Sequence, residues 1–331
     1  MSDYTRSSSS EIQIPEDSPA PNPTNHRRRG LAIKALVLLV VFALGGGSGY
    51  LMGRRLGHEV VATSTAQSQD DAMILMHQIN PPDGYKIPAT FGDVGPKMVA
   101  AGAIDMVKFT NLYQRQNKPL TNDQMTILTK GTNTRIVINP DNAYFLLNFF
   151  WALGLVNQNA ILTEGPMVSG GIDQVGGFAS TGGWTIGVKS PTELYASTKI
   201  MTLTVEQQAR LLEVASGVYR PCCNNPTHFP DCNHGMAMLG LLEHMASQNA
   251  SSDEMFETAK YVTAFWYPQQ MLEVATAFKA IENVDFVKAD AKTLVSSQFA
   301  SISGFQAVHQ WLSQNGLLEQ APSSGGSCGV Q

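Results

Sequence analysis

The residues with the greatest chemical potential in this chain stand close together in the segment 220–236. This segment holds three of the four cysteines and two of the seven histidines, with a methionine at its end. Thiolate, imidazole and thioether groups bind soft and borderline metals, chiefly Cu(I), zinc and the iron of iron–sulfur clusters. The sequence therefore predicts a metal site whose ligands are Cys222, Cys223, Cys232 and His234.

Two features of the spacing favour this metal site. Cys222 and Cys223 are adjacent, so both sulfurs can turn to one side of a loop and chelate a single ion. Cys232 follows Asp231, a good N-cap residue, so its thiol should lie near a helix N-terminus, where the positive end of the dipole favours the thiolate. A closed site of three thiolates and one imidazole is typical of zinc, whereas loss of one ligand, or participation of Met236, would favour copper as Cu(I).

Three further residues are possible additional ligands. They are His228, Met236 and Cys328, the last of which lies on the Gly- and Ser-rich end of the chain. The cysteine spacing matches no zinc-finger, haem-attachment or ferredoxin pattern. A [2Fe–2S] centre is therefore less favoured than zinc or copper.

The same thiols are compatible with two other functions. In an oxidising compartment, a structural disulfide is the ordinary use of an even number of cysteines. A bond between Cys222 and Cys223 would be strained, because neighbouring Cα atoms lie only about 3.8 Å apart. Pairing of these residues with Cys232 and Cys328 would instead give a thiol–disulfide redox protein or a disulfide-stapled scaffold or interaction protein. Enzymatic turnover stays open, because a zinc hydrolase needs a general base and the sequence does not single one out.

The N-terminal part predicts where the site lies in the cell. Residues 1–30 are polar and indicate a disordered cytoplasmic tail, and residues 31–52 indicate a single-pass transmembrane helix. Residues 35–52 carry no charge and are long enough to cross the bilayer core. The excess of basic residues before the span favours a cytoplasmic N-terminus and a C-terminal domain outside the cytoplasm, at the cell membrane. A cleaved signal peptide is the alternative.

The predicted partners follow from this anchor and from the composition. The lipid bilayer is one, and a homodimer is another, because Gly45, Gly49 and Gly53 are spaced so that two such helices could approach closely. The formal net charge is −5 and only 15% of residues are charged, so nothing in the composition indicates a nucleic-acid partner and none is predicted. No feature identifies a protein partner.

Most of the remaining chain predicts helices, so the fold class is mainly α. Residues 53–84 are expected to form a polar spacer, residues 85–320 one compact helical domain, and residues 321–331 a flexible tail. Thr121 and Thr204 each precede a Gln by three residues, which is a capping-box pattern, and Asn139 before Pro140 is a further N-cap candidate. The expected helices include 95–114, 143–153, 191–199, 208–219, 233–247, 252–266, 269–281 and 303–315.

Two segments depart from this helical pattern. Residues 135–138 give the only strand signal. Residues 165–187 contain three Gly–Gly pairs and predict a long ordered loop, packed over the core by Phe178 and Trp184. No phosphate-binding glycine motif accompanies these pairs.

Overall fold

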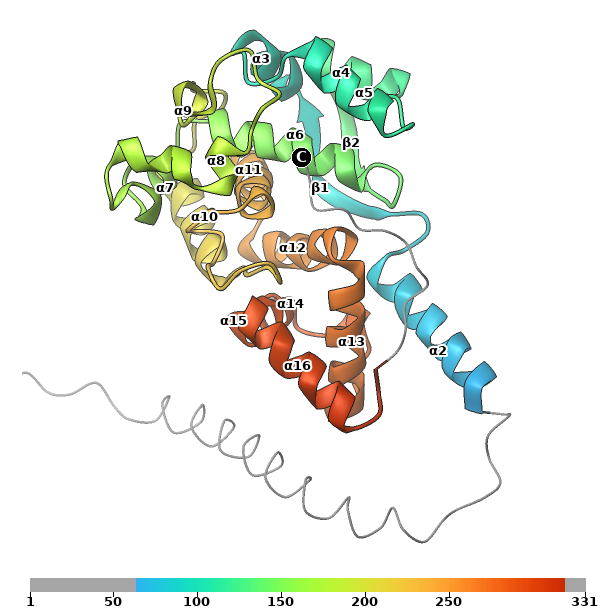
Figure 1. The fold of residues 1–331 in the computed structure, drawn as a ribbon. Coiled ribbons are helices and arrows are strands. Elements are labelled where there is room, and N and C mark those ends of the chain that lie inside the picture. Colours follow the sequence, from blue (N-terminus) through green and yellow to red (C-terminus); the bar gives the residue numbers. More distant parts are fainter. Residues whose placement is uncertain (1–63, 319–331) are drawn as a thin grey trace, which may run out of the picture. The chain divides into compact units, whose positions relative to one another are not determined.

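The fold is built mainly from helices, as predicted, in a computed structural model that describes residues 64–318 (Figure 1). The expected cytoplasmic tail, the anchor at 31–52 and the C-terminal tail with Cys328 lie outside the described residues. Within residues 64–318, no helix combines the length and the apolar character that a bilayer span requires.

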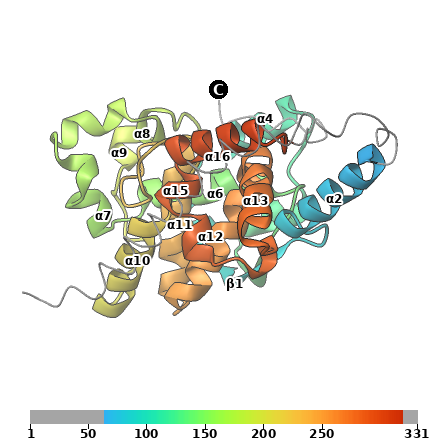
Figure 2. The ribbon, with the colours of Figure 1, turned by 90° about the horizontal axis from the view of Figure 1, so that it is seen from below.

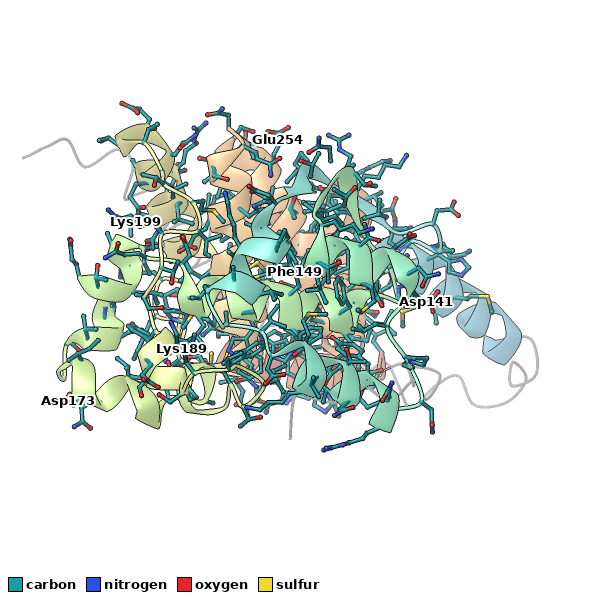
Figure 3. All side chains as sticks on the ribbon, turned by 90° about the horizontal axis from the view of Figure 1, so that it is seen from above. Asp141, Phe149, Asp173, Lys189, Lys199 and Glu254 are labelled. Carbon is teal, nitrogen blue, oxygen red and sulfur yellow. The ribbon has the colours of Figure 1, made fainter. Side chains whose placement is uncertain are left out.

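Two helices that cross at the centre of the large hydrophobic core form its frame. These are α6 (Ala143–Val156), which is apolar on every side, and α11 (Asn233–Ser247). Their backbones touch at Gly154 and Gly240, since a Cβ on either residue would overlap the backbone of the other helix. This close contact fixes α11, whose N-terminus carries the candidate site. Figure 3 shows Phe149 of α6 in the interior and Asp141 and Asp173 on the outside.

A two-stranded antiparallel sheet and three helices cover one side of this frame. Strand β1 (Tyr85–Gly92) pairs with β2 (Thr132–Ile138), which contains the predicted strand, whereas β1 was not predicted. The inward residues of β1 pack on α6, where Phe91 meets Phe149 edge to face at 5.6 Å. The accompanying helices are α3 (Val94–Ala100), α4 (Met106–Arg115) and α5 (Asn122–Thr129).

The predicted helix over 95–114 is wrong as a single element. The helix is interrupted between α3 and α4, where Gly102 has a φ of +79°. Asp105 then caps α4, because its side chain accepts from the backbone N–H of Val107 at 2.9 Å. A left-handed residue followed by an N-cap ends one helix and starts another.

The other cap predictions have mixed outcomes. Both capping boxes are present, at Thr121 before α5 and at Thr204 before α10 (Val205–Gly217). Asn139 is not an N-cap: α6 begins at Ala143 with Asn142 as its N-cap residue. The Asn139 side chain instead accepts from the backbone N–H of Asn142 at 3.0 Å and forms a turn before the helix.

The Gly-rich segment is a series of single helical turns rather than one continuous loop. Trp184 is completely buried and donates its indole N–H to the Ala103 carbonyl at 2.7 Å. Its ring also meets Trp151 of α6 edge to face at 5.0 Å. The expected packing of this segment over the core is therefore confirmed for Trp184. Its turns are η1 (Pro166–Val168), η2 (Ile172–Gly177) and α8 (Ala179–Gly182); α7 (Ala160–Thr163) precedes the segment and α9 (Pro191–Leu194) follows it.

The C-terminal helices pack around a second, smaller hydrophobic cluster. In this cluster α13 (Pro268–Glu282) and α16 (Ile302–Gln314) lie side by side, as Figures 1 and 2 show. Helix α2 (Ser64–Ile79) packs on α13 and buries Ile79, so part of the expected spacer at 53–84 is helical. The remaining elements are α12 (Ser252–Trp266), η3 (Phe286–Lys288), α14 (Ala291–Leu294) and α15 (Ser297–Ala300).

A buried carboxyl group lies on α11 within the core. Glu243 is fully buried and accepts one hydrogen bond, from the Asn157 amide at 3.0 Å, while its Oε1 has no partner among the described residues. Burial raises the pKa of Glu243 to about 8, although the Asn157 hydrogen bond acts in the opposite direction. The group is therefore largely protonated at neutral pH.

Glu243→Gln should change how stability depends on pH. The ordinary pKa is 4.5 and the folded one is about 8. Between these values the folded protein holds a proton that the unfolded chain has lost, so the free energy of unfolding falls as pH rises, by up to about 1.4 kcal/mol per pH unit. Glutamine does not titrate, so the variant should gain stability relative to the parent as pH increases through this window.

Urea unfolding of both proteins at several pH values between about 5 and 7.5 measures this difference. Glu164→Gln, on an exposed residue, is the matched control and should follow the parent. A constant stability difference between Glu243→Gln and the parent across this range would contradict the assignment.

Candidate metal centre

The candidate site lies in the loop of residues 218–232, called here the cysteine loop, between α10 and α11. Prolines at 221, 226 and 230 have no backbone N–H and prevent a regular element here. The loop closes on itself where the backbone N–H and hydroxyl of Thr227 both donate to the Val218 carbonyl, at 2.8 and 3.0 Å. A buried threonine therefore holds its two halves together.

Two segments distant in sequence brace the cysteine loop. The backbone N–H of Ile302 donates to the Cys223 carbonyl at 3.0 Å at the start of α16. From the Gly-rich segment, the N–H of Ser180 donates to the Asp231 carbonyl at 3.2 Å. These contacts hold the loop backbone in one conformation, so the sulfurs have a defined support. Phe178 also meets Phe229 edge to face at 5.5 Å, so it packs on the cysteine loop.

The guanidinium of Arg220 occupies the interior of the cysteine loop. This residue is only 2% exposed. It donates to the backbone carbonyls of Asn225 at 2.7 Å and Phe229 at 3.1 Å. It also donates to the Asp231 carboxylate at 2.7 Å and to the Cys232 sulfur at 3.1 Å. A single planar group thus orients two backbone carbonyls, one carboxylate and one candidate ligand.

Gly235, in the first turn of α11, makes room for this arginine. A side-chain carbon at position 235 would overlap the Arg220 guanidinium. The guanidinium therefore lies directly against the N-terminal turn of α11. This contact explains why a glycine stands in the first turn of a helix, where it is otherwise unfavourable.

The sulfurs of Cys222, Cys223 and Cys232 converge. All three lie within 4.8 Å of one another, which is close enough to hold one metal ion. The sulfurs of Cys222 and Cys232 are 3.3 Å apart. None of the three is in a disulfide; Cys222 is exposed and the other two are half-buried. The predicted convergence of these three cysteines is confirmed, and Cys222 is the exposed member of the group.

Cys232 is the sulfur best stabilised as a thiolate. It is itself the N-cap of α11, because its sulfur accepts from the backbone N–H of Gly235 at 3.3 Å. Hydrogen bonds from Cys222 and Cys223, together with the charge of Arg220, lower the pKa of Cys232 well below its usual value. The expected thiol at a helix N-terminus is thus confirmed. Asp231 is not the cap, because its carboxylate pairs with Arg220.

The pKa values of the two neighbouring thiols, Cys222 and Cys223, shift in the opposite direction. Hydrogen bonds to Cys223 and Cys232, together with burial, raise the pKa of Cys222. For Cys223, the hydrogen bond with Cys222 acts to lower the pKa, but the contact with Cys232 and burial raise it overall. Without a metal, the cluster therefore carries one thiolate and two thiols. A bound cation would favour loss of the other two protons, so metal binding should release protons.

The predicted imidazole ligand lies outside the group of three sulfurs. His234 is 7% exposed, and its ring packs against Tyr267 with centroids 4.5 Å apart and against Trp266 at 5.8 Å. Burial lowers the pKa of His234 to about 4, so its ring is neutral at physiological pH. Among the described residues, the group with metal-compatible spacing contains no imidazole. His234 therefore belongs to an aromatic layer beside the sulfurs.

The possible additional ligands are not part of the group either. His228 is half-buried, and its backbone N–H holds the loop to α10 through the Ala215 carbonyl at 2.9 Å. Met236 is completely buried in the main hydrophobic core. Neither residue belongs to the three-sulfur group of residues 64–318. Cys328 lies outside the described residues.

Three residues that shape the site were not predicted from the sequence. Arg220 and Asp231 are the only Lys, Arg, Asp or Glu residues between positions 214 and 242, and this isolation in an uncharged stretch was the available signal. Burial raises the pKa of Tyr267 well above its usual value, and the charges of Cys222 and Cys232 raise it further. This phenol therefore stays neutral beside the sulfurs, and no local pattern relates position 267 to the loop.

The donor set determines which ions the cluster can hold. Three thiolates select soft and borderline ions, and they leave a tetrahedral ion such as zinc one ligand short of a closed protein site. Comparison of the chain with family models, with curated proteins and with solved structures gives no match. The chemistry of the three sulfurs therefore indicates which ions the cluster could hold.

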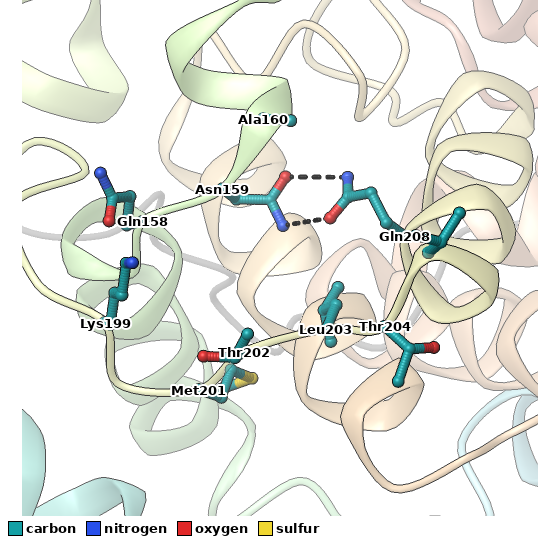
Figure 4. Close-up of a pocket in the computed structure, with 10 residues that line it drawn as sticks. Gln158, Asn159, Ala160, Lys199, Met201, Thr202, Leu203, Thr204 and Gln208 are labelled. Carbon is teal, nitrogen blue, oxygen red and sulfur yellow. Dashed lines mark hydrogen bonds between the residues drawn. The ribbon is translucent and has the colours of Figure 1, made fainter.

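A separate hollow of about 360 Å³ lies at the N-terminus of α10 (Figure 4). Asn159 and Gln208 face each other across it, and their amides exchange two hydrogen bonds at 3.0 and 3.1 Å. Its lining includes Lys199 but no thiol, imidazole or carboxylate. The amides of Asn159 and Gln208 are thus each other's hydrogen-bond partners.

Arg220→Gln should destabilise the protein and make the thiolate form of Cys232 less favourable. Glutamine cannot reach the four acceptors of the guanidinium, and breaking a buried ion pair by removing one partner typically costs about 3–5 kcal/mol. Without the cation, the pKa of Cys232 should rise. Urea unfolding and pH-dependent alkylation of Cys232, followed by mass spectrometry, measure the two effects.

Arg135→Gln, the same substitution on an exposed arginine, is the control and should change stability by no more than about 0.5 kcal/mol. Overlapping alkylation profiles for parent and Arg220→Gln would show that the guanidinium does not stabilise the Cys232 thiolate.

Proposed function

We propose that this protein is a membrane-anchored, extracytoplasmic metal-binding protein that holds one soft or borderline ion through Cys222, Cys223 and Cys232. The observation that carries the proposal is the convergence of three unbonded sulfurs within 4.8 Å on a braced loop. Like-charged thiolates at such distances repel one another unless a cation lies between them. A buried arginine already offsets part of this charge, and a metal ion would offset the rest.

The composition of the cluster favours copper in its Cu(I) state over zinc. A closed zinc site needs four ligands, and the fourth candidate, His234, packs against aromatic rings instead. Three soft sulfur donors without an imidazole favour Cu(I). Zinc would have to complete its coordination with water or with a ligand from outside residues 64–318. Because Cys222 is exposed, an ion held here could exchange with another carrier, which suits metal handling.

The cellular location in this proposal rests on the sequence. The uncharged run at 35–52 and the basic residues before it support an anchor with the helical domain outside the cytoplasm. The bilayer is then the first partner, and the glycines at 45, 49 and 53 support pairing of two anchors.

Metal titration of the full chain under reducing, oxygen-free conditions tests the proposal. Competition with a chelator of known affinity should give one equivalent of Cu(I) for the parent. Cys222→Ser, Cys223→Ser and Cys232→Ser should each weaken binding by more than the 10–100-fold loss that is typical of outer-shell partners. His234→Phe keeps the aromatic packing and should bind within about threefold of the parent, because the imidazole is not a ligand.

Two outcomes would contradict the proposal. The first is less than about a tenth of an equivalent of Cu(I) or zinc in the folded parent, because a preformed trithiolate site should bind either ion. The second is unchanged affinity in all three serine variants, which would place the ion elsewhere.

A further inference from the structure

Two of the three sulfurs are already positioned as a pair. Cys222 and Cys232 come from opposite ends of the cysteine loop, yet their sulfurs are 3.3 Å apart and unbonded. The sulfur of Cys223 lies beside the Asn225 carbonyl at 3.8 Å and the Asp231 carboxylate at 3.7 Å. Its bond to the adjacent Cys222 would be strained. The 3.3 Å contact therefore favours a bond between Cys222 and Cys232 among the described cysteines.

The surroundings of this pair give its members different roles. Cys222 is exposed and can meet a molecule from solution. The Cys232 sulfur accepts hydrogen bonds from Arg220 at 3.1 Å and from the backbone N–H of Gly235 at 3.3 Å. Donors of this kind stabilise a sulfur anion, both as a nucleophile and as a leaving group. An accessible sulfur beside a stabilised one is the arrangement that reversible thiol–disulfide exchange requires.

We infer that Cys222 and Cys232 form a reversible dithiol–disulfide couple that reacts with low-molecular-weight disulfides of the glutathione type. Cys222 passes its proton to the Cys232 thiolate, whose sulfur is 3.3 Å away, and attacks one sulfur of the small disulfide. The S–S bond of the small disulfide breaks and releases one small thiolate, which takes up this proton from Cys232. The Cys232 thiolate then attacks the Cys222 sulfur of the mixed disulfide, and the second small thiolate leaves. The two protein sulfurs are oxidised and form one S–S bond, while the small disulfide is reduced to one thiol, which carries the proton of Cys222, and one thiolate.

The reverse reaction uses the same geometry. A small thiolate attacks the exposed Cys222 sulfur, and the Cys232 thiolate leaves into the hydrogen bonds of Arg220 and Gly235. The backbone supports of the loop lie outside the pair, at Thr227, Ile302 and Ser180, so the bond can form and break while they persist.

The couple has a consequence for the metal that rests on the proposed function. Oxidation removes two of three sulfur ligands and leaves Cys223, and one thiolate holds an ion far more weakly than three. The oxidised loop should therefore release its ion, and reduction should restore binding. The redox state would thus set when the protein carries metal.

The test uses the reduced full chain and oxidised glutathione in the absence of oxygen. After alkylation of free thiols, mass spectrometry should find Cys222 bonded to Cys232 and Cys223 alkylated, and dithiothreitol should reverse the bond. Cys223→Ser should form the same bond at a rate within about threefold of the parent, whereas Cys222→Ser should not form it. Position 222 is exposed, so Cys222→Ser should fold, and urea unfolding checks this.

A second arm uses the chain loaded with zinc, which does not itself undergo redox chemistry. Zinc release, followed with a chromogenic chelator, should accompany formation of the bond, and it should be at least about tenfold slower in the same zinc-loaded chain when oxidised glutathione is left out. A reduced protein that binds zinc or Cu(I) but pairs Cys223 or Cys328 instead, or forms no bond, overturns this inference and leaves the proposed function standing. A protein that forms the Cys222–Cys232 bond but binds no metal when reduced overturns the proposed function and supports the couple.

Discussion

The buried guanidinium of Arg220 is the interaction on which the site depends. A charge removed from water must be compensated by hydrogen bonds and opposite charge, or the fold loses several kcal/mol. Arg220 meets this requirement with acceptors spread between positions 225 and 232, so the loop must curl around it. Because one acceptor is the Cys232 sulfur, the Arg220 guanidinium both shapes the loop and stabilises the thiolate of a proposed ligand. Gly235 is part of this constraint, since only glycine leaves space for the guanidinium against α11.

The rest of the fold supplies a rigid support for this loop. The glycine contact between α6 and α11 fixes the helix whose N-terminus holds Cys232. Trp184 anchors the Gly-rich segment in the core, and Phe178 of this segment packs against Phe229 of the cysteine loop. Contacts from α16 hold the opposite side at Cys223. The sulfurs are therefore preorganised, and an ion that binds does not have to order the chain first.

Strong local signals in the sequence predict helices correctly, whereas contacts between residues that are distant in the chain cannot be predicted from such signals. Helices α11 and α12 have the expected bounds, because apolar runs and caps mark their ends. Strand β1 was missed because Pro88 interrupts a short alternating pattern. The convergence of three cysteines followed from their nearness in the chain, but His234 did not join them. It stands in the first turn of α11, whereas Cys232 is the extended N-cap residue, and its ring packs against Trp266 and Tyr267. The partners of Arg220 follow no period, and their roles emerge only in three dimensions.

The coordination of a bound ion tests the central claim most directly. X-ray absorption spectroscopy of the protein loaded with one equivalent of Cu(I) or zinc counts the sulfur and nitrogen neighbours of the metal. We predict three sulfur scatterers, with zinc–sulfur distances of about 2.3 Å when zinc is bound. The spectrum should contain no contribution from the imidazole of His234, so His234→Phe should leave it unchanged. A first shell with two or fewer sulfurs, or with an imidazole nitrogen that His234→Phe removes, would contradict the three-sulfur centre.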